Sequence, residues 1–286
     1  MRGKARSHGA VSIINGIPMG KGAGLGIGLE TVAEVELFEG AGPIEVEIEE
    51  DPNEDPSLAR EIIKTILQKY SIPEMNGHVR INSEIPIGRG LKSSSTASNA
   101  IGLATMSALD LEISNLDIIN IGVDSSLRTG ISITGAFDDA CASFFGGIVI
   151  TDNYSRKILR NEKVMDLKIL IHVPEEKIHT KNVDRERLRT VKPLIDEAFG
   201  LALRGEYWKA MSLNGLIIAS SIDKPVKPAI EALATGALAS GFSGTGPATA
   251  AVCMKEDVDL VYESWSKIPG KIIESVTNIK KAEVIS

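Results

Sequence analysis

Cysteine, basic residues and long apolar runs are scarce in this chain, and each scarcity excludes a class of protein. Two cysteines, Cys141 and Cys253, are too few for a disulfide framework, and no spacing of cysteine with histidine suggests a zinc site. The 31 Lys and Arg residues are outnumbered by 38 Asp and Glu residues, which argues against a nucleic-acid-binding surface. No stretch approaches the roughly 18 apolar residues of a membrane span. We therefore expect a protein of the reducing cytoplasm, without nucleic-acid or membrane partners.

What the chain does contain is the composition of an ordinary globular protein. It has 286 residues, of which 43% are hydrophobic and 24% are charged. A disordered chain would be poorer in apolar residues. The length allows one large domain or two modest domains, each with a real core.

Apolar periodicity predicts mixed strands and helices in the first half. Closely spaced glycines over 1–30 indicate strands joined by a loop whose backbone approaches another group closely. The strict Ile/Val–Glu alternation over 44–48 is typical of a half-solvated strand near a sheet edge. Further strands are expected over 32–39, 79–85 and 148–150, and helices are expected from Ser57, from Ser94 (rich in small residues), over 115–127 and over 136–143.

The second half also alternates between the two patterns. Strands are expected over 167–173, 248–254 and 271–276, with helices over 193–203, 206–221, 228–239 and 258–267. This order predicts an α/β (α+β) sandwich whose sheet is covered on one side. The polar run 152–162 places the domain boundary, so we expect domains at 1–155 and 156–286.

The two best-known phosphate-binding motifs do not fit this chain. Gly20-Lys21 is followed by glycine and not by Ser or Thr, and Gly16 is one position too close for a P-loop. No Gly-x-Gly-x-x-Gly follows a strand and opens a helix, so a Rossmann nucleotide site is unsupported.

The segment 86–96 carries the strongest chemical signal. Its proline ends a strand, two glycines permit positive φ, and four consecutive hydroxyl residues stand at the start of the small-residue helix. A helix N-terminus offers unsatisfied N–H groups and partial positive charge, and Arg89 and Lys92 add to that charge. A phosphate cradle is one interpretation. A serine-rich helix cap without a ligand is the other.

Two more segments are candidates for a site. Ser243 to Ala248 combines two glycines with two hydroxyls, which favours an anion or simply a turn before a strand. Asp138 and Asp139 lie in an otherwise apolar segment, where carboxylates are costly to bury unless they are paired or used. Surface N-capping is the alternative for these acids.

These residues resemble the GHMP small-molecule kinases, which include galactokinase, homoserine kinase and mevalonate kinase. The family's second motif is Pro, three residues, then Gly-Leu-Gly-Ser-Ser-Ala, and it stands here as 86–96. The third motif is a glycine-rich turn, here 243–248. More narrowly, 90–95, 134–140 and the Gly-Lys-Gly-Ala-Gly run at 20–24 look like the archaeal type of shikimate kinase, in which a lysine such as Lys92 replaces the third loop glycine.

The resemblance implies a two-domain GHMP kinase fold, with an N-terminal α/β domain containing a left-handed crossover and a ferredoxin-like C-terminal domain. It also implies a catalytic aspartate seven residues before two glycines, which is Asp139, with Asp138 as the nearest competitor. Lys4 matches the lysine of the first motif, although Arg2 stands where the family has proline. The implied ATP-binding residues, with Ser94 near Mg²⁺, are Pro86, Ile87, Gly88, Arg89, Gly90, Leu91, Lys92, Ser93, Ser94, Ser95 and Thr96.

The implied reaction is ATP-dependent phosphorylation of shikimate to 3-phosphoshikimate. A basic residue should face the carboxylate of shikimate, and Arg6, Lys21 and Arg128 are candidates that also fit solvated surface charges. A GHMP kinase for another small alcohol, such as homoserine, is the enzyme alternative. A non-catalytic nucleotide or metabolite sensor is the alternative of another class. The sequence does not predict an oligomeric state.

Overall fold

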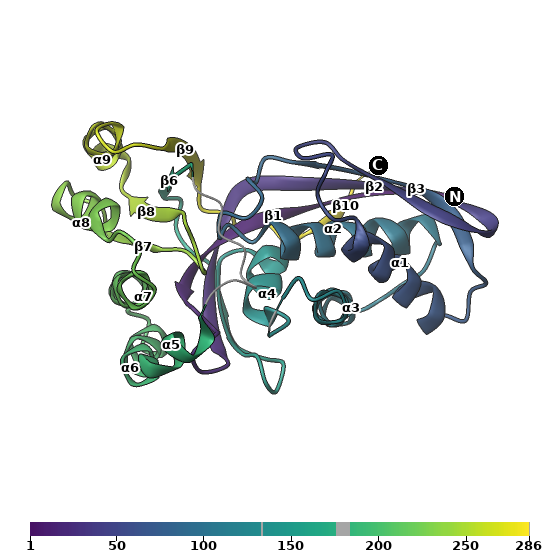
Figure 1. Ribbon diagram of the computed structural model, residues 1–286, viewed down its shortest axis with the longest axis horizontal. Coiled ribbons are helices and arrows are strands. Elements are labelled where there is room, and N and C mark those ends of the chain that lie inside the picture. Colours follow the sequence, from purple (N-terminus) through teal and green to yellow (C-terminus); the bar gives the residue numbers. More distant parts are fainter. Residues whose placement is uncertain (133, 176–183, 286) are drawn as a thin grey trace.

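A computed structural model describes residues 1–132, 134–175 and 184–285. Figure 1 shows two parts side by side, joined by the long strands that run through the middle of the molecule. One part is a sheet with helices α1–α4 on one face, and the other is a smaller sheet with helices α5–α9. Both chain termini lie in the first part (Figure 1).

The first sheet is built mainly from one long hairpin. Strands β1 (Arg2–Ile14) and β2 (Lys21–Ile48) pair in antiparallel fashion over most of the length of β1. The order is β10-β1-β2-β4-β5, with β3 also paired to β2, where the remaining strands are β3 (Met75–Ser83), β4 (Ile148–Asp152), β5 (Lys157–Glu162) and β10 (Glu283–Val284). The strands expected over 32–39, 79–85 and 148–150 are therefore present.

The segment 44–48 is a half-solvated strand, as its alternating pattern predicted, and it lies beside β3. Ile44 pairs with Gly77 and Ile48 with Ile81, so this stretch of β2 runs in the same direction as β3. Its isoleucine and valine side chains are half-buried and its glutamates are exposed. Helix α1 (Ser57–Lys69) makes the crossover between the two segments.

Three more helices complete the first layer: α2 (Ser93–Ala108), α3 (Asn115–Arg128) and α4 (Phe137–Phe145). Helix α2 lies in the interior, as its small residues predicted, because Ala100 and Ala104 are fully buried against the sheet. Small side chains let the helix axis approach the strands closely. The first turns of α2 and α4 lie at the junction with the smaller sheet, where residues of both turns line a cavity together with Gly244 and Thr245.

The smaller sheet has the order β7-β8-β6-β9, with strands β6 (Lys168–Val173), β7 (Ala239–Phe242), β8 (Thr249–Cys253) and β9 (Lys271–Val276). This βαββαβ chain order with a 2-3-1-4 strand order is ferredoxin-like, as expected. The helices are α5 (Arg185–Thr190), α6 (Lys192–Leu203), α7 (Tyr207–Ser221), α8 (Lys227–Ala234), the short 3₁₀ turn η2 (Lys255–Asp257) and α9 (Val258–Ser266).

Strand β7 is a correction to the sequence analysis. The helix expected over 228–239 ends at Ala234, and the chain turns into β7 at Ala239. With only four residues and a glycine in the middle, β7 carries almost no strand pattern. It becomes a strand because it pairs with β8 and packs its fully buried residues in the core.

The strand pairing bears on the expected boundary at 155/156. Strand β5 pairs with β4, so that boundary falls inside a hairpin of the first sheet. The chain also returns to this sheet at its end, where β10 pairs with β1. We propose that the smaller domain begins after Glu162 and ends before β10. Across the residues that the structure describes, each helix is too short or too polar to cross a membrane.

Candidate active site

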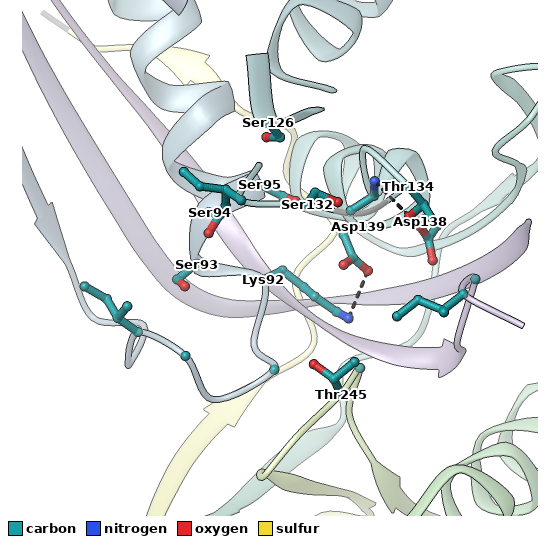
Figure 2. Close-up of a pocket in the computed structure, with 18 of the residues that line it drawn as sticks. Lys92, Ser93, Ser94, Ser95, Ser126, Ser132, Thr134, Asp138, Asp139 and Thr245 are labelled. Carbon is teal, nitrogen blue, oxygen red and sulfur yellow. Dashed lines mark hydrogen bonds and ion pairs between the residues drawn. The ribbon is translucent and has the colours of Figure 1, made fainter. Parts of the chain in front are cut away.

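A cavity of about 290 Å³ opens where the two parts meet. Residues from five stretches of chain line it: 12–17, 54–55, 87–95, 126–139 and 244–245. Figure 2 shows the serines of α2 on one side, Asp138 and Asp139 of α4 on another, and Thr245 of the smaller domain facing them. The second family motif, the third family motif and the acidic pair are therefore brought to one place.

The N-terminus of α2 is open toward this cavity. The residue before the helix is Lys92, which has left-handed backbone angles (φ 68°, ψ 29°), and no side chain of the described residues caps the helix. Ser93, Ser94 and Ser95 form the first turn and line the cavity. The first N–H groups of a helix lack partners inside the helix, so they are available to an anion. The geometry thus favours the phosphate cradle over the serine cap.

Two glycine-rich loops are joined behind the cradle. Gly90 has φ 78°, and a Cβ there would lie 2.2 Å from the carbonyl oxygen of Ser243. The hydroxyl of Ser243 donates to the carbonyl of Gly90 over 2.8 Å and accepts from the N–H of Ser12 over 3.0 Å. Only glycine permits this approach. The loop 243–248 therefore helps to shape the cradle, and it is more than a turn before β8.

A buried ion pair crosses the cavity floor. The Nζ atom of Lys92 lies 2.9 Å from Oδ1 of Asp139 (Figure 2). It also donates to the hydroxyl of Ser12 over 2.8 Å. The side chain of Lys92 is only 5% exposed, whereas that of Asp139 is 23% exposed. Asp139 thus presents a carboxylate to the cavity whose charge is balanced from behind.

Asp138 stands beside this pair in a different environment. It is 5% exposed, and its Oδ1 accepts a hydrogen bond of 2.8 Å from Nδ2 of Asn153. Burial raises the pKa of Asp138 to about 7, the charge of Asp139 adds to the rise, and Lys92 and Asn153 oppose it. The carboxyl of Asp138 therefore titrates near neutral pH.

Not every residue of the expected ATP loop faces the cavity. Ile87, Gly88, Gly90 and the run 92–95 line it. Leu91 is buried in the core, and the hydroxyl of Thr96 donates to the carbonyl of Lys92 inside its own helix. The remaining two, Pro86 and Arg89, lie outside the lining, and the guanidinium of Arg89 donates to the carbonyls of Pro174 and Glu175.

Lys4 is not brought to the site, which corrects the expectation taken from the first family motif. It lies on β1 opposite Glu34, and its Nζ is 2.6 Å from that carboxylate. The cation beside Asp139 is Lys92. The residue of β1 that reaches this cation is Ser12, eight positions further along the strand.

The three candidates for binding an acceptor carboxylate also lie outside the cavity lining. Arg6 is paired with Glu283 over 2.6 Å, and Arg128 is paired with Glu61 over 2.6 Å. The ammonium of Lys21 lies over the ring of Phe199. Within the described lining, Lys92 is the one cation, so the structure does not support any of the three for this role.

Comparison with known proteins identifies the family to which this chain belongs. Residues 57–147 match the family described as GHMP kinases N terminal domain. A shikimate kinase of Methanosarcina acetivorans is 40% identical over 282 residues, which cover 98% of this chain and 95% of that protein. A shikimate kinase of Methanothrix thermoacetophila is 39% identical over 284 residues, with 99% and 96% covered. The chain belongs to the shikimate kinase family of GHMP kinases.

Solved structures agree with this family at the level of the fold. A homoserine kinase of Cytophaga hutchinsonii superposes with a TM-score of 0.79 at 17% identity, covering 99% of this chain and 97% of that one. A mevalonate kinase of L. major superposes with a TM-score of 0.75 at 14% identity, covering 98% and 97%. The GHMP kinase fold is therefore confirmed for this member of the shikimate kinase family.

Sequence reasoning missed two polar groups that complete the site of this shikimate kinase family member. Ser12 lies in a strand whose pattern gave no sign of function, and Asn153 stands out in the sequence only as part of a glycosylation sequon. Both are buried and bonded, Ser12 to Lys92 and Asn153 to Asp138. Neither has a local motif, because each acts through a residue more than ten positions away.

The buried carboxyl of Asp138 predicts a pH-dependent stability. Its pKa is about 7 in the folded protein and 3.8 when the side chain is fully solvated, so the folded state binds more protons between pH 4 and 7. Stability should fall as pH rises through that window. In Asp138→Asn this slope should be lost, so the variant should gain a few kcal/mol over the wild type at pH 8 and nothing at pH 4. Denaturant unfolding at both pH values measures this, and an equal difference at both would contradict it.

Proposed function

We propose that this protein transfers the γ-phosphoryl group of ATP to a hydroxyl of shikimate, which gives 3-phosphoshikimate and ADP. One observation carries the proposal: an open helix N-terminus and a lysine-paired aspartate meet in a single cavity. The first suits a polyphosphate, and the second suits a hydroxyl that must lose its proton. Membership of the shikimate kinase family supports shikimate as the acceptor.

A second, smaller cavity supports a place for the nucleoside. It has a volume of about 80 Å³ and shares Ser93 and Ser94 with the main cavity. Its walls include the apolar side chains of Leu58, Ile81 and Ile101. An aromatic base in this cavity would direct the triphosphate along the first turn of α2 toward Asp139. ATP therefore fits across the two cavities, with its phosphates over residues 93–95.

The donor set at the cradle also fits Mg²⁺. This ion usually keeps several waters and takes one or two protein oxygens together with substrate phosphates. The hydroxyl of Ser94 is exposed at the head of α2 and borders both cavities, where it can supply one such oxygen. When bound, the ion would neutralise charge on the β- and γ-phosphates. Among the described residues no cluster of three His, Cys, Asp or Glu side chains forms a cage for a metal, which agrees with a site completed by substrate.

The roles of the chain's own residues follow from their positions. Phosphoryl transfer depends chiefly on positioning and charge balance. Asp139 orients the acceptor hydroxyl and takes its proton as the new bond to phosphorus forms. Lys92 balances the charge of Asp139 and is itself held by Ser12. The amides of residues 93–95 bind the phosphates, and the junction of the two loops fixes where they lie.

The part of the cavity beside the cradle and Asp139 suits an acceptor with several hydroxyls (Figure 2). It carries the side chains of Ser126, Thr129, Ser132 and Thr134, all of which border the main cavity. Hydroxyl groups can donate and accept, so they match a polyol in more than one orientation. The two cysteines are buried and unpaired, which supports the cytoplasmic setting within this proposal.

The proposal is tested by measuring ADP release in a coupled assay with Mg²⁺ and ATP. We expect turnover with shikimate and at least about 100-fold lower kcat/KM with homoserine, because a site built for ring hydroxyls leaves its polar groups unpaired with a shorter alcohol. Turnover with homoserine alone would replace shikimate as the acceptor. Binding of ATP without ADP release from any candidate alcohol would instead indicate a sensor, against which the lysine-paired Asp139 argues.

A further inference from the structure

The mechanism above uses Asp139 and leaves Asp138 without a role, although Asp138 is the more deeply buried of the two. Both residues lie in the first turn of α4 and line the main cavity. Consecutive residues diverge by about 100° around a helix axis, so the two carboxylates face different neighbours. Asp139 faces Lys92 (Figure 2), whereas Asp138 accepts a hydrogen bond from Asn153, which follows β4.

A short chain of hydrogen bonds holds Asp138 from behind. The hydroxyl of Thr151 donates to Oδ1 of Asn153 over 2.7 Å, and Nδ2 of Asn153 donates to Oδ1 of Asp138 over 2.8 Å. An ionised carboxylate only accepts hydrogen bonds, so the NH₂ group of Asn153 faces Asp138 and the amide oxygen is left to accept from Thr151. Asn153 and Thr151 are both buried. Asn153 of the sequon Asn153-Tyr154-Ser155 therefore holds a carboxyl group that lines the cavity.

Two glycines, Gly16 and Gly22, confine the carboxylate of Asp138 on another side. A Cβ at Gly22 would lie 2.0 Å from Oδ2 of Asp138, and one at Gly16 would lie 3.0 Å from it. Real Cβ atoms do not approach another atom to 2.0 Å, so the missing side chain of Gly22 makes room for this carboxylate, and Gly16 adds to that room. The prediction that this glycine-rich stretch approaches another group closely is confirmed at Gly22. With Asn153 and the glycines around it, the carboxylate can move little.

The charges around Asp138 indicate what it can bind. The charged groups near it are Asp139 on its own helix and Lys92 on α2, and Lys92 is bonded to Asp139 and Ser12. Cys141, also on α4, has a pKa raised well above its usual value by burial, so it stays neutral. Lys92, the one cation of the described lining, is already paired with Asp139, so this side of the cavity has no further positive charge for a phosphate, and Asp138 faces the acceptor and not ATP. A carboxylate there accepts hydrogen bonds from hydroxyl groups.

We propose that Asp138, positioned by Asn153 and Thr151, determines acceptor specificity by binding the hydroxyl next to the one that is phosphorylated. This rests on the proposed function, in which the reacting hydroxyl lies at Asp139. Since the two aspartates are adjacent in one helical turn, their partners are adjacent hydroxyls of one ring. For shikimate phosphorylated at its 3-hydroxyl, the partner of Asp138 is the 4-hydroxyl.

Acceptor analogues test the contact with Asp138 directly. For Asp138→Asn we expect kcat/KM for shikimate to fall about 10- to 100-fold, mostly through KM, because a hydrogen bond to a charged group is lost. KM for ATP should change less than about twofold. With 4-deoxyshikimate the wild type and variant should differ by less than about threefold, and with 5-deoxyshikimate the full difference should return. Equal ratios for all three acceptors would overturn the proposal.

Variants of the supporting residues test positioning. Asn153→Leu removes a bond that favours the charged form of Asp138, so the acid limb of kcat/KM for shikimate should move to higher pH. Thr151→Val should shift it in the same direction, and Thr151→Ser, which keeps the hydroxyl, should restore the wild-type profile. A merely structural role would lower activity at all pH values alike, and that outcome would overturn the positioning role.

Controls separate this inference from the proposed function. Asp196→Asn, an exposed acid on α6, should match the wild type in every assay. Shikimate binding by calorimetry decides the case for any variant without measurable turnover. A wild-type protein that releases no ADP with shikimate would overturn the proposed function and this inference together. An active wild type whose folded Asp138→Asn variant binds shikimate normally would overturn the inference alone.

Discussion

Replacing Asp139 by asparagine should lower kcat about 10²- to 10⁴-fold while leaving KM for ATP within about threefold of the wild type. Positioned general bases contribute factors of this size. Asparagine keeps the shape of the side chain, and it cannot take a proton from the acceptor. The side chain of Asp139 is the more exposed partner of its ion pair, so the cavity itself should keep its form. Steady-state kinetics with saturating Mg²⁺ measure the loss.

The neighbouring aspartate provides the matched control for this prediction. Asp138→Asn changes the same atoms one position earlier in the same helical turn, and its main expected effect is on KM for the acceptor. Near-normal kcat in Asp139→Asn together with a collapse of kcat in Asp138→Asn would reverse the two assignments. The sequence could not decide between these residues by counting alone. The structure favours Asp139, because Lys92 forms its ion pair with this carboxylate and not with that of Asp138.

Much of the fold could be predicted because its elements carry strong local patterns. The alternation at 44–48 and the small residues of α2 each reflect the environment in which the segment lies. Strand β7 was not predicted, because it has only four residues and they are buried on both faces. Neither the two-residue period of a strand nor the 3.6-residue period of a helix can be seen in it. Tertiary pairing with β8 decides its structure, and a local pattern cannot report that.

The candidate site was predictable where a motif binds its ligand with consecutive residues. Residues 93–95 were found because glycines followed by consecutive hydroxyl residues at the start of a helix form a local pattern that suits a phosphate. Lys4 was misplaced because a motif position on a strand fixes only the strand and not the distance along it to the site. Asn153 and Ser12 act by holding other side chains, and contacts over such sequence separations leave no local spacing to find.

The second large effect is expected for Lys92→Met, which keeps most of the side chain's volume and removes its charge. Asp138 and Asp139 would then share the cavity without a cation, and the loss of Lys92 would raise the pKa of Asp138 further. Removing one partner of a buried ion pair costs about 3–5 kcal/mol, and the partial exposure of Asp139 places this case near the lower figure. We also expect kcat to fall about 10²- to 10³-fold.

The way in which the destabilisation changes with pH distinguishes the loss of charge from the loss of packing. An unpaired carboxylate costs least when it can take a proton, so the destabilisation of Lys92→Met should be largest at pH 8 and should shrink toward pH 5. Lys92→Arg keeps the charge, so it does not separate charge from packing. The sharper control is the double variant Lys92→Met/Asp139→Asn, which removes both charges. It should recover most of the lost stability and none of the turnover. If its free energy of unfolding equals that of Lys92→Met, lost packing and not the unpaired charge explains the single variant.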